Sequence, residues 1–345
     1  MLQEKYRPKT LDELKHLDCV AVLKTFAPSN FPSLILAGPN GSGKRTLLHA
    51  LIKHFFDKEV HYMSYTTDIE VSASKTLEVS LLESDEAIEV RVGPHGYYDK
   101  KVLQKIAKDI SETKSIKGLL LGDKRRAAKL LIIPDGEELS SGAQMALRRI
   151  MEQGAENFRL IILTTTTNTF IDAFKSRFLI CRVPTISDME INQLIGRILT
   201  AEQSTLPEDQ IKSIVKESRG NLHKVMAKLE LALHTKKVGP FPWEESINAL
   251  ADTIILAPSI KSVVKARESI YGLLDKNIPG QAILSMLVLS LLQKEASVET
   301  AANLLKYASL FDSRLRAGTK DLFHLEAFVA RAMAIYGNNS SINNK

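Results

Sequence analysis

Cysteine and long apolar runs are scarce in this 345-residue chain. Its two cysteines, Cys19 and Cys181, exclude a disulfide framework or a cysteine-rich zinc site and fit a reducing compartment. The longest mainly apolar run, Ala282 to Leu292, is shorter than the ~20 residues that a membrane-spanning helix needs. We therefore expect no membrane partner. The first ten residues, MLQEKYRPKT, are charged and lack an apolar core, so we also expect no secretory signal.

Charge of one sign is also in short supply. The chain carries 46 Lys and Arg against 40 Asp and Glu, a formal net charge of +6. This excess favours a polyanionic partner but is too small to establish one. Hydrophobic residues make up 44% of the chain and charged residues 25%, which excludes a disordered or fibrous protein. The length predicts two or three domains.

The pattern of apolar residues changes near Pro184. Before it, short apolar runs without alternation lie between helical stretches, which is typical of parallel strands buried on both faces. After it, almost every segment has helical spacing, beginning with a capping box of Ser187 and Glu190. The Gly- and Pro-rich break at Val238–Trp243 predicts a linker. The expected strands are Leu34–Ala37, Leu130–Ile133, Leu160–Leu163 and Leu179–Val183. The predicted domains are an α/β domain over 1–183, a small helical domain over 184–237, a helical domain over 238–337 and a disordered tail over 338–345.

A glycine-rich segment matches the first seven positions of the P-loop pattern GxxxxGK[ST]. Its residues are Gly38, Pro39, Asn40, Gly41, Ser42, Gly43 and Lys44. In such a loop the glycines let backbone amides surround phosphates, and Lys44 reaches the outer phosphates. The eighth position, whose Ser or Thr hydroxyl holds Mg²⁺, is Arg45, and Thr46 comes one place too late. The segment therefore predicts a pocket for ATP or ADP in which Mg²⁺ is held weakly.

The strand predicted at 130–133 should end in a pair of carboxylates. Pro134 takes the position of the metal-facing Asp, and Asp135 takes that of the water-activating Glu. Because Asp is one methylene shorter than Glu, its reach toward an attacking water is reduced. An acidic turn that opens the next helix is the simpler explanation of this segment, and a weakened catalytic pair is the alternative.

Four stretches follow one another in a specific order and spacing. They are Glu4–Thr10 (EKYRPKT), the P-loop, Ala143–Glu152 (AQMALRRIME) and Ser176–Phe178 (SRF). Together they resemble the clamp-loader branch of the AAA+ family, and most of all the small subunits of eukaryotic replication factor C. The resemblance covers nearly the whole chain. It implies an AAA+ P-loop domain with a parallel sheet, followed by a small helical lid and an all-α collar.

The resemblance is closest to the subunit type at the end of the pentameric arc, whose own ATPase site is degenerate. That type has a basic residue at the eighth P-loop position and a β-hairpin insertion. Here the insertion would lie at about 70–100, with strands Leu77–Leu82 and Ala87–Val92 around an acidic turn. The implied partners are the other replication factor C subunits of a heteropentamer, the sliding clamp and primer–template DNA, and the implied location is the nucleus.

The same resemblance assigns roles to single residues. Arg177 would be an arginine finger that acts in trans at a neighbour's ATP site, whereas spacing alone favours a surface arginine. The sensor-1 position falls at Thr165 and the sensor-2 position at His223, in place of the usual Asn and Arg. Arg7 and Pro8 would join the P-loop in binding nucleotide. With Arg45, Pro134 and Asp135, the sensors make five departures, which together predict static nucleotide binding with poor hydrolysis.

A cluster of basic residues just before the strand at 130–133 could contact DNA phosphates; the alternative is that it is an ordinary solvated loop. Two arginines of the stretch Ala143–Glu152 are further candidates. An acidic hairpin turn near DNA would repel phosphates. The DNA candidates are Lys124, Arg125, Arg126, Lys129, Arg148 and Arg149. Our first interpretation is a clamp-loader subunit with weak hydrolysis. The alternatives are a competent AAA+ ATPase subunit of a clamp loader or related remodelling complex, and a stand-alone nucleotide sensor.

Overall fold

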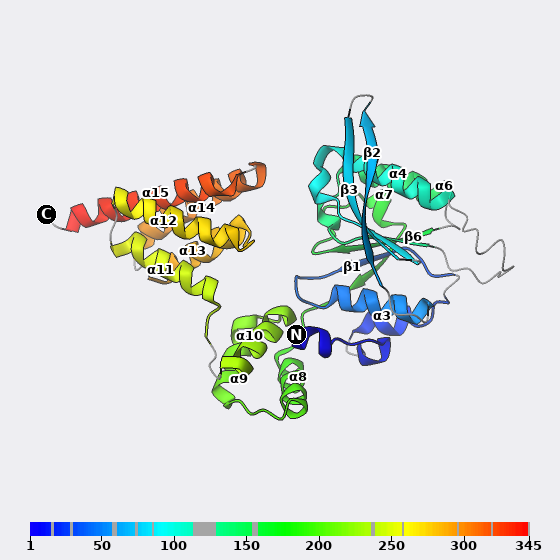
Figure 1. Ribbon diagram of the computed structural model, residues 1–345, viewed down its shortest axis with the longest axis horizontal. Helices are drawn as coiled ribbons and strands as arrows, with labels where there is room; N and C mark the ends of the chain where they lie inside the picture. The colour runs from blue at the N-terminus through cyan, green and yellow to red at the C-terminus, as the bar shows by residue number, and fades with distance from the viewer. Residues whose placement is uncertain are drawn as a thin grey trace. The chain divides into compact units, whose positions relative to one another are not determined.

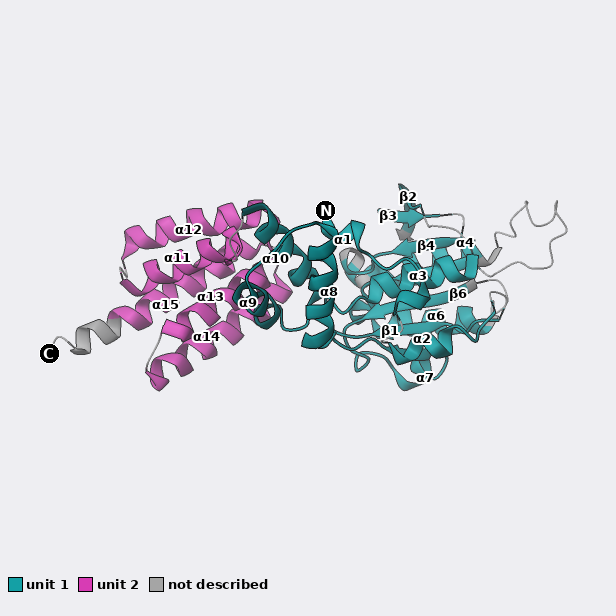
Figure 2. Ribbon diagram, turned by 90° about the horizontal axis from the view of Figure 1, so that it is seen from below, with its two compact units in different colours: residues 1–238 teal, residues 239–345 magenta. Residues whose placement is uncertain are grey.

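The computed structural model describes residues 1–14, 17–27, 30–56, 61–72, 75–84, 86–112, 129–153, 158–235, 239–256, 259–294, 297–318 and 320–343 (Figure 1). The chain forms two compact units, residues 1–238 and 239–345, which Figure 2 distinguishes by colour. The boundary falls at the Gly- and Pro-rich break that the sequence marks as a linker. Each unit is described by itself below.

A seven-stranded sheet with the order β2-β3-β4-β5-β6-β1-β7 organises the first unit. Five neighbouring strands are parallel: β4 (Ala87–Val90), β5 (Lys129–Ile133), β6 (Phe158–Thr164), β1 (Leu34–Ala37) and β7 (Leu179–Arg182). The four strands expected from apolar runs are therefore confirmed, with ends shifted by at most two residues. Leu34 and Leu36 pack on one face and Ile35 on the other, which explains why the strand lacks polar alternation.

Helices cover both faces of this sheet. On one face lie α4 (Asp99–Glu112), α6 (Ser141–Gln153) and α7 (Asp172–Lys175), and on the other lie η1 (Leu11–Leu14), α2 (Asp18–Leu23) and α3 (Lys44–Phe56). Figure 1 shows α3 on the opposite side of the sheet from α4 and α6. In a layered α/β fold of this kind, ligands bind at the carboxyl ends of the parallel strands.

The hairpin differs from its prediction. Strands β3 (Lys75–Glu83) and β4 pair antiparallel, as predicted for the two strands around the acidic turn. A further strand, β2 (Met63–Ser72), pairs with β3 along its length and was not predicted. The hairpin that projects from the sheet in Figure 1 is therefore β2–β3, and the turn after Glu83 is not its tip. Because β2 is largely exposed, its polar and β-branched residues give no continuous apolar run.

Three helices follow the sheet, in the segment for which the resemblance implies a small helical lid, and they are called the lid below. They are α8 (Asp188–Ala201), α9 (Glu208–Ser218) and α10 (Leu222–Thr235), and they share an apolar core of their own. Ser187 and Glu190 form the predicted capping box at the start of α8. The N-terminal segment, which includes α1 (Leu2–Lys5), packs on this lid: Tyr6 donates its hydroxyl to Glu202 Oε1 at 2.7 Å. Two short 3₁₀ turns, η2 (Gly93–Tyr98) and η3 (Gly136–Glu138), border the sheet.

The second unit is a helical bundle. It comprises α11 (Pro242–Leu256), α12 (Ile260–Asp275), α13 (Gly280–Lys294), α14 (Val298–Ala317) and α15 (Asp321–Asn343) around one apolar core. Helix α15 is assigned as far as Asn343, within the segment 338–345 for which the sequence predicts a disordered tail; residues 344–345 lie outside the described residues. None of the described helices is long and apolar enough to cross a membrane.

Candidate nucleotide site

The P-loop follows β1 and leads directly into α3, as the sequence predicts. Gly41 and Gly43 adopt φ angles of 80° and 94°, which favour glycine over other residues. A Cβ atom on Gly38 would lie 2.1 Å from the carbonyl oxygen of Val183, so this glycine is required by close packing. Ser42 is buried, and its hydroxyl has no hydrogen-bond partner. A tight glycine cradle with an unpaired polar atom fits a bound phosphate chain.

Lys44 is folded back onto this loop. Its Nζ donates hydrogen bonds to the carbonyl oxygens of Gly38 at 2.5 Å and Pro39 at 3.0 Å. Burial lowers the pKa of Lys44, and the nearby carboxylate of Glu137 opposes that effect. The carbonyl oxygens hold the ammonium group where nucleotide phosphates would replace them as acceptors.

The lid meets the P-loop through the start of α10. Leu222 N donates to the carbonyl oxygen of Gly41 at 3.0 Å, and the Asn221 side chain lies directly against Gly41. Asn221 Oδ1 also accepts from Lys224 N at 3.2 Å and caps the helix. Two residues after Asn221, at the predicted sensor-2 position, the exposed His223 ring hydrogen-bonds through Nδ1 to Gln3 Oε1 at 2.9 Å. The structure therefore joins His223 to the N-terminal segment.

Arg45 occupies the position of the usual magnesium-binding hydroxyl. Its Nη2 donates to both carboxylate oxygens of Glu89, at 2.7 Å each. The Glu89 side chain is only 1% exposed, whereas that of Arg45 is 43% exposed. Sequence reasoning missed Glu89, although a single acid within the buried strand Ala87–Val90 is a signal, because a buried charge needs a partner.

The residues after β5 also depart from a working carboxylate pair. Asp135 accepts hydrogen bonds from the backbone N–H groups of Val92, at 2.9 Å, and Gly93, at 3.1 Å, and so anchors the loop after β4. The second acid that sequence reasoning missed is Glu137 on η3. Its carboxylate accepts hydrogen bonds from Thr165 N at 3.3 Å and from Thr165 Oγ1 at 3.4 Å. Its negative charge is the one that raises the pKa of Lys44 against the effect of burial.

Arg177 lies two residues after the end of α7 and is half-buried. Its Nη1 donates to the carbonyl oxygen of Ala173 at 3.1 Å, and its Nη2 is paired with Glu152 on α6. Arg148 Nε donates to the same Glu152 carboxylate at 3.1 Å. Hydrogen bonds and charge from Arg148 and Arg177 hold the pKa of Glu152 below its usual range. Phe178 is buried against Phe174, with ring centroids 4.7 Å apart, so the last residue of the SRF stretch contributes to packing.

The remaining predicted residues are dispersed. Arg7 pairs with Glu4 at 3.1 Å, Pro8 and Thr46 are half-buried, and Lys129 Nζ pairs with Glu83 Oε1 at 2.7 Å. Arg149 is exposed on α6. The predicted DNA contacts Lys124, Arg125 and Arg126 lie outside the described residues.

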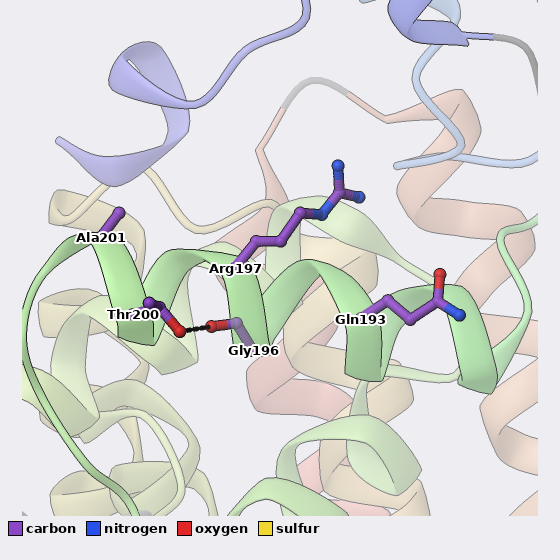
Figure 3. Close-up of a pocket in the computed structure, with 5 residues that line it drawn as sticks. All are labelled: Gln193, Gly196, Arg197, Thr200 and Ala201. Carbon is purple, nitrogen blue, oxygen red and sulfur yellow. Dashed lines mark hydrogen bonds between the residues drawn. The ribbon is translucent and has the colours of Figure 1, made fainter.

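A separate surface hollow of about 620 Å³ lies on α8. Figure 3 shows its lining residues Gln193, Gly196, Arg197, Thr200 and Ala201, with Thr200 Oγ1 donating to the Gly196 carbonyl at 2.9 Å. No P-loop residue lines it. Within the described ranges, moreover, no group of three His, Cys, Asp or Glu side chains is placed to hold a metal ion.

Comparison with known proteins gives the family. Over 345 aligned residues the chain is 33% identical to replication factor C subunit 5 of Saccharomyces cerevisiae, an alignment that covers 96% of this chain and 98% of that protein. The chain belongs to the replication factor C subunit family. Replication factor C subunit 5 of Oryza sativa subsp. japonica is also 33% identical, with 96% of both chains covered. Residues 243–340 match the family model "Replication factor C subunit 3, C-terminal domain".

Membership in the replication factor C family agrees with the architecture. It confirms an AAA+ P-loop domain followed by helical domains, and a place within a multi-subunit clamp loader. Among solved structures, the Thermotoga maritima RuvB Holliday junction branch migration motor is 16% identical, with 72% of this chain and 79% of that chain covered. Its TM-score of 0.44 is too low to carry a functional argument.

Proposed function

We propose that this replication factor C subunit binds ATP or ADP at its own P-loop, hydrolyses it poorly, and supplies Arg177 to the nucleotide site of a neighbouring subunit. In this proposal the assembled heteropentamer loads the sliding clamp onto primer–template DNA in the nucleus. The cradle residues Gly38, Gly41, Ser42 and Lys44 support the nucleotide-binding part.

The main support for weak hydrolysis is that the residues at the expected catalytic positions make structural contacts instead. The residue at the magnesium-binding position, Arg45, is paired with Glu89. Pro134 offers no carboxylate, and Asp135 is committed to the amides of Val92 and Gly93. A general base must reach the attacking water. Because the short Asp135 carboxylate is held by two backbone amides, it is poorly placed to do so.

The chain's own residues would therefore bind and orient the nucleotide. The P-loop amides and Lys44 donate to phosphate oxygens, and the first turn of α3 adds its partial positive charge. Mg²⁺, when bound in sites of this type, neutralises phosphate charge; here the residue at its usual ligand position is Arg45. The contact of Leu222 N with Gly41 couples the lid to the occupied or empty state of the loop.

The proposed action of Arg177 in trans is supported by two features: its guanidinium is partly exposed, and hydrogen bonds hold that group in one orientation. Ala173 and Glu152 hold two of its nitrogen atoms on the surface beside α6 and α7. An arginine finger contributes on the order of 10³–10⁵ in rate at the site that it completes. In the assembled complex, Arg177→Ala should lower ATP turnover strongly, whereas Arg182→Ala, which removes an exposed arginine on β7, should not. Equal effects of the two variants would contradict the proposed finger.

The collar supports an interface with other subunits. Phe311, Leu315 and Phe328 fill its core, as expected for a bundle. Leu305 and Phe323 on α14 and α15 remain 51% and 53% exposed. Large exposed apolar side chains of this kind often mark a protein–protein contact. Sedimentation of the chain with and without co-expressed family members tests this; a stable monomer that ignores the other subunits would favour the stand-alone sensor.

One observation favours the alternative of a competent ATPase. Glu137 lies beside Thr165 and acts on Lys44, so a carboxylate is present near the expected phosphate position. Magnesium-dependent turnover by the purified chain distinguishes the two functions. Our proposal predicts nucleotide binding with turnover no higher than that of Lys44→Ala, whereas substantial turnover that Glu137→Gln abolishes would establish the alternative.

A further inference from the structure

The ion pair between Arg45 and Glu89 is more than a lost magnesium ligand. We propose that Arg45, anchored by Glu89, supplies the positive charge that a divalent cation supplies in other P-loop sites, so that nucleotide binds here without Mg²⁺. This inference rests on the proposed nucleotide-binding function. Arg45 would contact the phosphates, and Glu89 would hold its guanidinium in place.

The position of Glu89 fits this role. Ala87, two residues earlier on β4, packs in the cluster that contains α3, and alternate strand residues face the same side of a sheet. Glu89 is in register with Ile132 of β5, two residues before Pro134. The pair therefore joins the first turn of α3 to the sheet beside the strand end where a metal-facing carboxylate is expected.

The geometry of the pair leaves the arginine able to bind phosphate. A guanidinium has five N–H donors, and Glu89 engages only Nη2. Because the Arg45 side chain is 43% exposed, its other donors remain accessible to a phosphate oxygen. Glu89, at 1% exposure, neutralises part of the charge and limits the directions that the guanidinium can take.

The same arrangement is unsuited to Mg²⁺. This ion requires near-octahedral oxygen ligands at about 2.0–2.1 Å, usually including one or two carboxylates. The Glu89 carboxylate is already engaged by Arg45, and Asp135 is held by the backbone amides of Val92 and Gly93. A positively charged side chain at the hydroxyl position also repels the ion. A fixed positive charge from Arg45 and a bound Mg²⁺ would therefore serve the same purpose at this site.

The test is the affinity of the purified full chain for ATP and ADP, measured by calorimetry in magnesium and in EDTA. Wild-type Kd should change by less than about twofold between the two conditions, and Arg45→Lys, which keeps the charge, should behave similarly. Arg45→Thr restores a hydroxyl and should bind at least about tenfold more tightly with Mg²⁺ than in EDTA. Glu89→Gln removes a nearby negative charge but also frees the guanidinium, and the loss of anchoring should weaken binding about fivefold in both conditions. Arg91→Thr, an exposed arginine after β4, is the matched control and should leave Kd unchanged.

Each outcome has a distinct meaning. Wild-type binding that weakens tenfold or more in EDTA overturns the inference, and so does Arg45→Thr binding that ignores Mg²⁺. Unchanged or tighter binding by Glu89→Gln refutes the anchoring role of Glu89. Failure of the wild-type chain to bind nucleotide in either condition refutes the proposed function itself. Arg45→Lys binding that differs from wild type would refute the claim that positive charge at position 45 is what the nucleotide requires.

Discussion

Replacing Arg45 by alanine leaves Glu89 as a buried carboxylate without its cation. Removing one partner of a fully buried ion pair costs about 3–5 kcal/mol. Here the lost guanidinium is 43% exposed, so water can enter the space that it leaves and solvate the carboxylate in part. The penalty should therefore fall to about 1–3 kcal/mol, the cost of an unsatisfied buried group. The double variant Arg45→Ala, Glu89→Gln should recover part of this loss, because it removes the unpaired charge.

The assay must report on the first unit alone. The single tryptophan, Trp243, lies in the second unit, so its fluorescence does not follow the P-loop domain. Native-state hydrogen exchange of peptides from α3 and β4 gives the required local value, and peptides from α13 provide an internal control. A loss of about 1–3 kcal/mol accelerates exchange through subglobal opening on the order of 5- to 150-fold.

Unchanged exchange in α3 and β4 of Arg45→Ala would refute the energetic account of the pair. Equal acceleration in α13 would also refute it, because the effect would then not be confined to the first unit. A double variant as unstable as the single variant would show that the unpaired Glu89 charge is not the cause.

Three further predictions test other parts of the structure. Gly136→Ala should destabilise the first unit by about 1–3 kcal/mol in local hydrogen exchange, because its Cβ would lie 2.3 Å from Ile162 Cγ2. Burial and the charges of Arg45 and Arg7 lower the pKa of His49 in the folded chain. Because the unfolded chain then binds a proton more readily, the stability of this unit should fall as pH drops through about 6.5. His49→Phe should flatten that dependence between about pH 7.5 and 5.5. Glu152→Ala should leave the midpoint of denaturant titration nearly unchanged, because water screens its partly exposed ion pairs. It should also lower ATP turnover of the assembled complex less than Arg177→Ala does.

The parts of the fold that sequence reasoning predicted are those with strong local signals. Buried parallel strands give continuous apolar runs, as at Leu34–Ala37, and the P-loop glycines give a motif whose flanking strand and helix can be checked. The capping box at Ser187 and Glu190 fixes a helix start from two residues. These signals are local, so the chain order alone carries them.

The parts that escaped prediction depend on contacts between distant segments. Glu89 and Arg45 are 44 residues apart, and their pairing follows from strand order in the sheet. Glu137 lies near Thr165 only because η3 follows a strand adjacent to β6. Strand β2 is stabilised by its pairing with β3 and has little buried apolar surface to reveal it. Sequence reasoning therefore found the cradle but not the charges around it.

The most direct test of weak hydrolysis at this chain's own site compares Lys44→Ala with Arg177→Ala in the assembled complex. Steady-state ATP turnover with clamp and primer–template DNA present is measured for both, with Lys53→Ala on the same helix as control. We predict that Arg177→Ala lowers turnover strongly, because it disables a neighbour's site, and that Lys44→Ala has a much smaller effect. A loss of turnover in Lys44→Ala as large as that in Arg177→Ala would contradict the account.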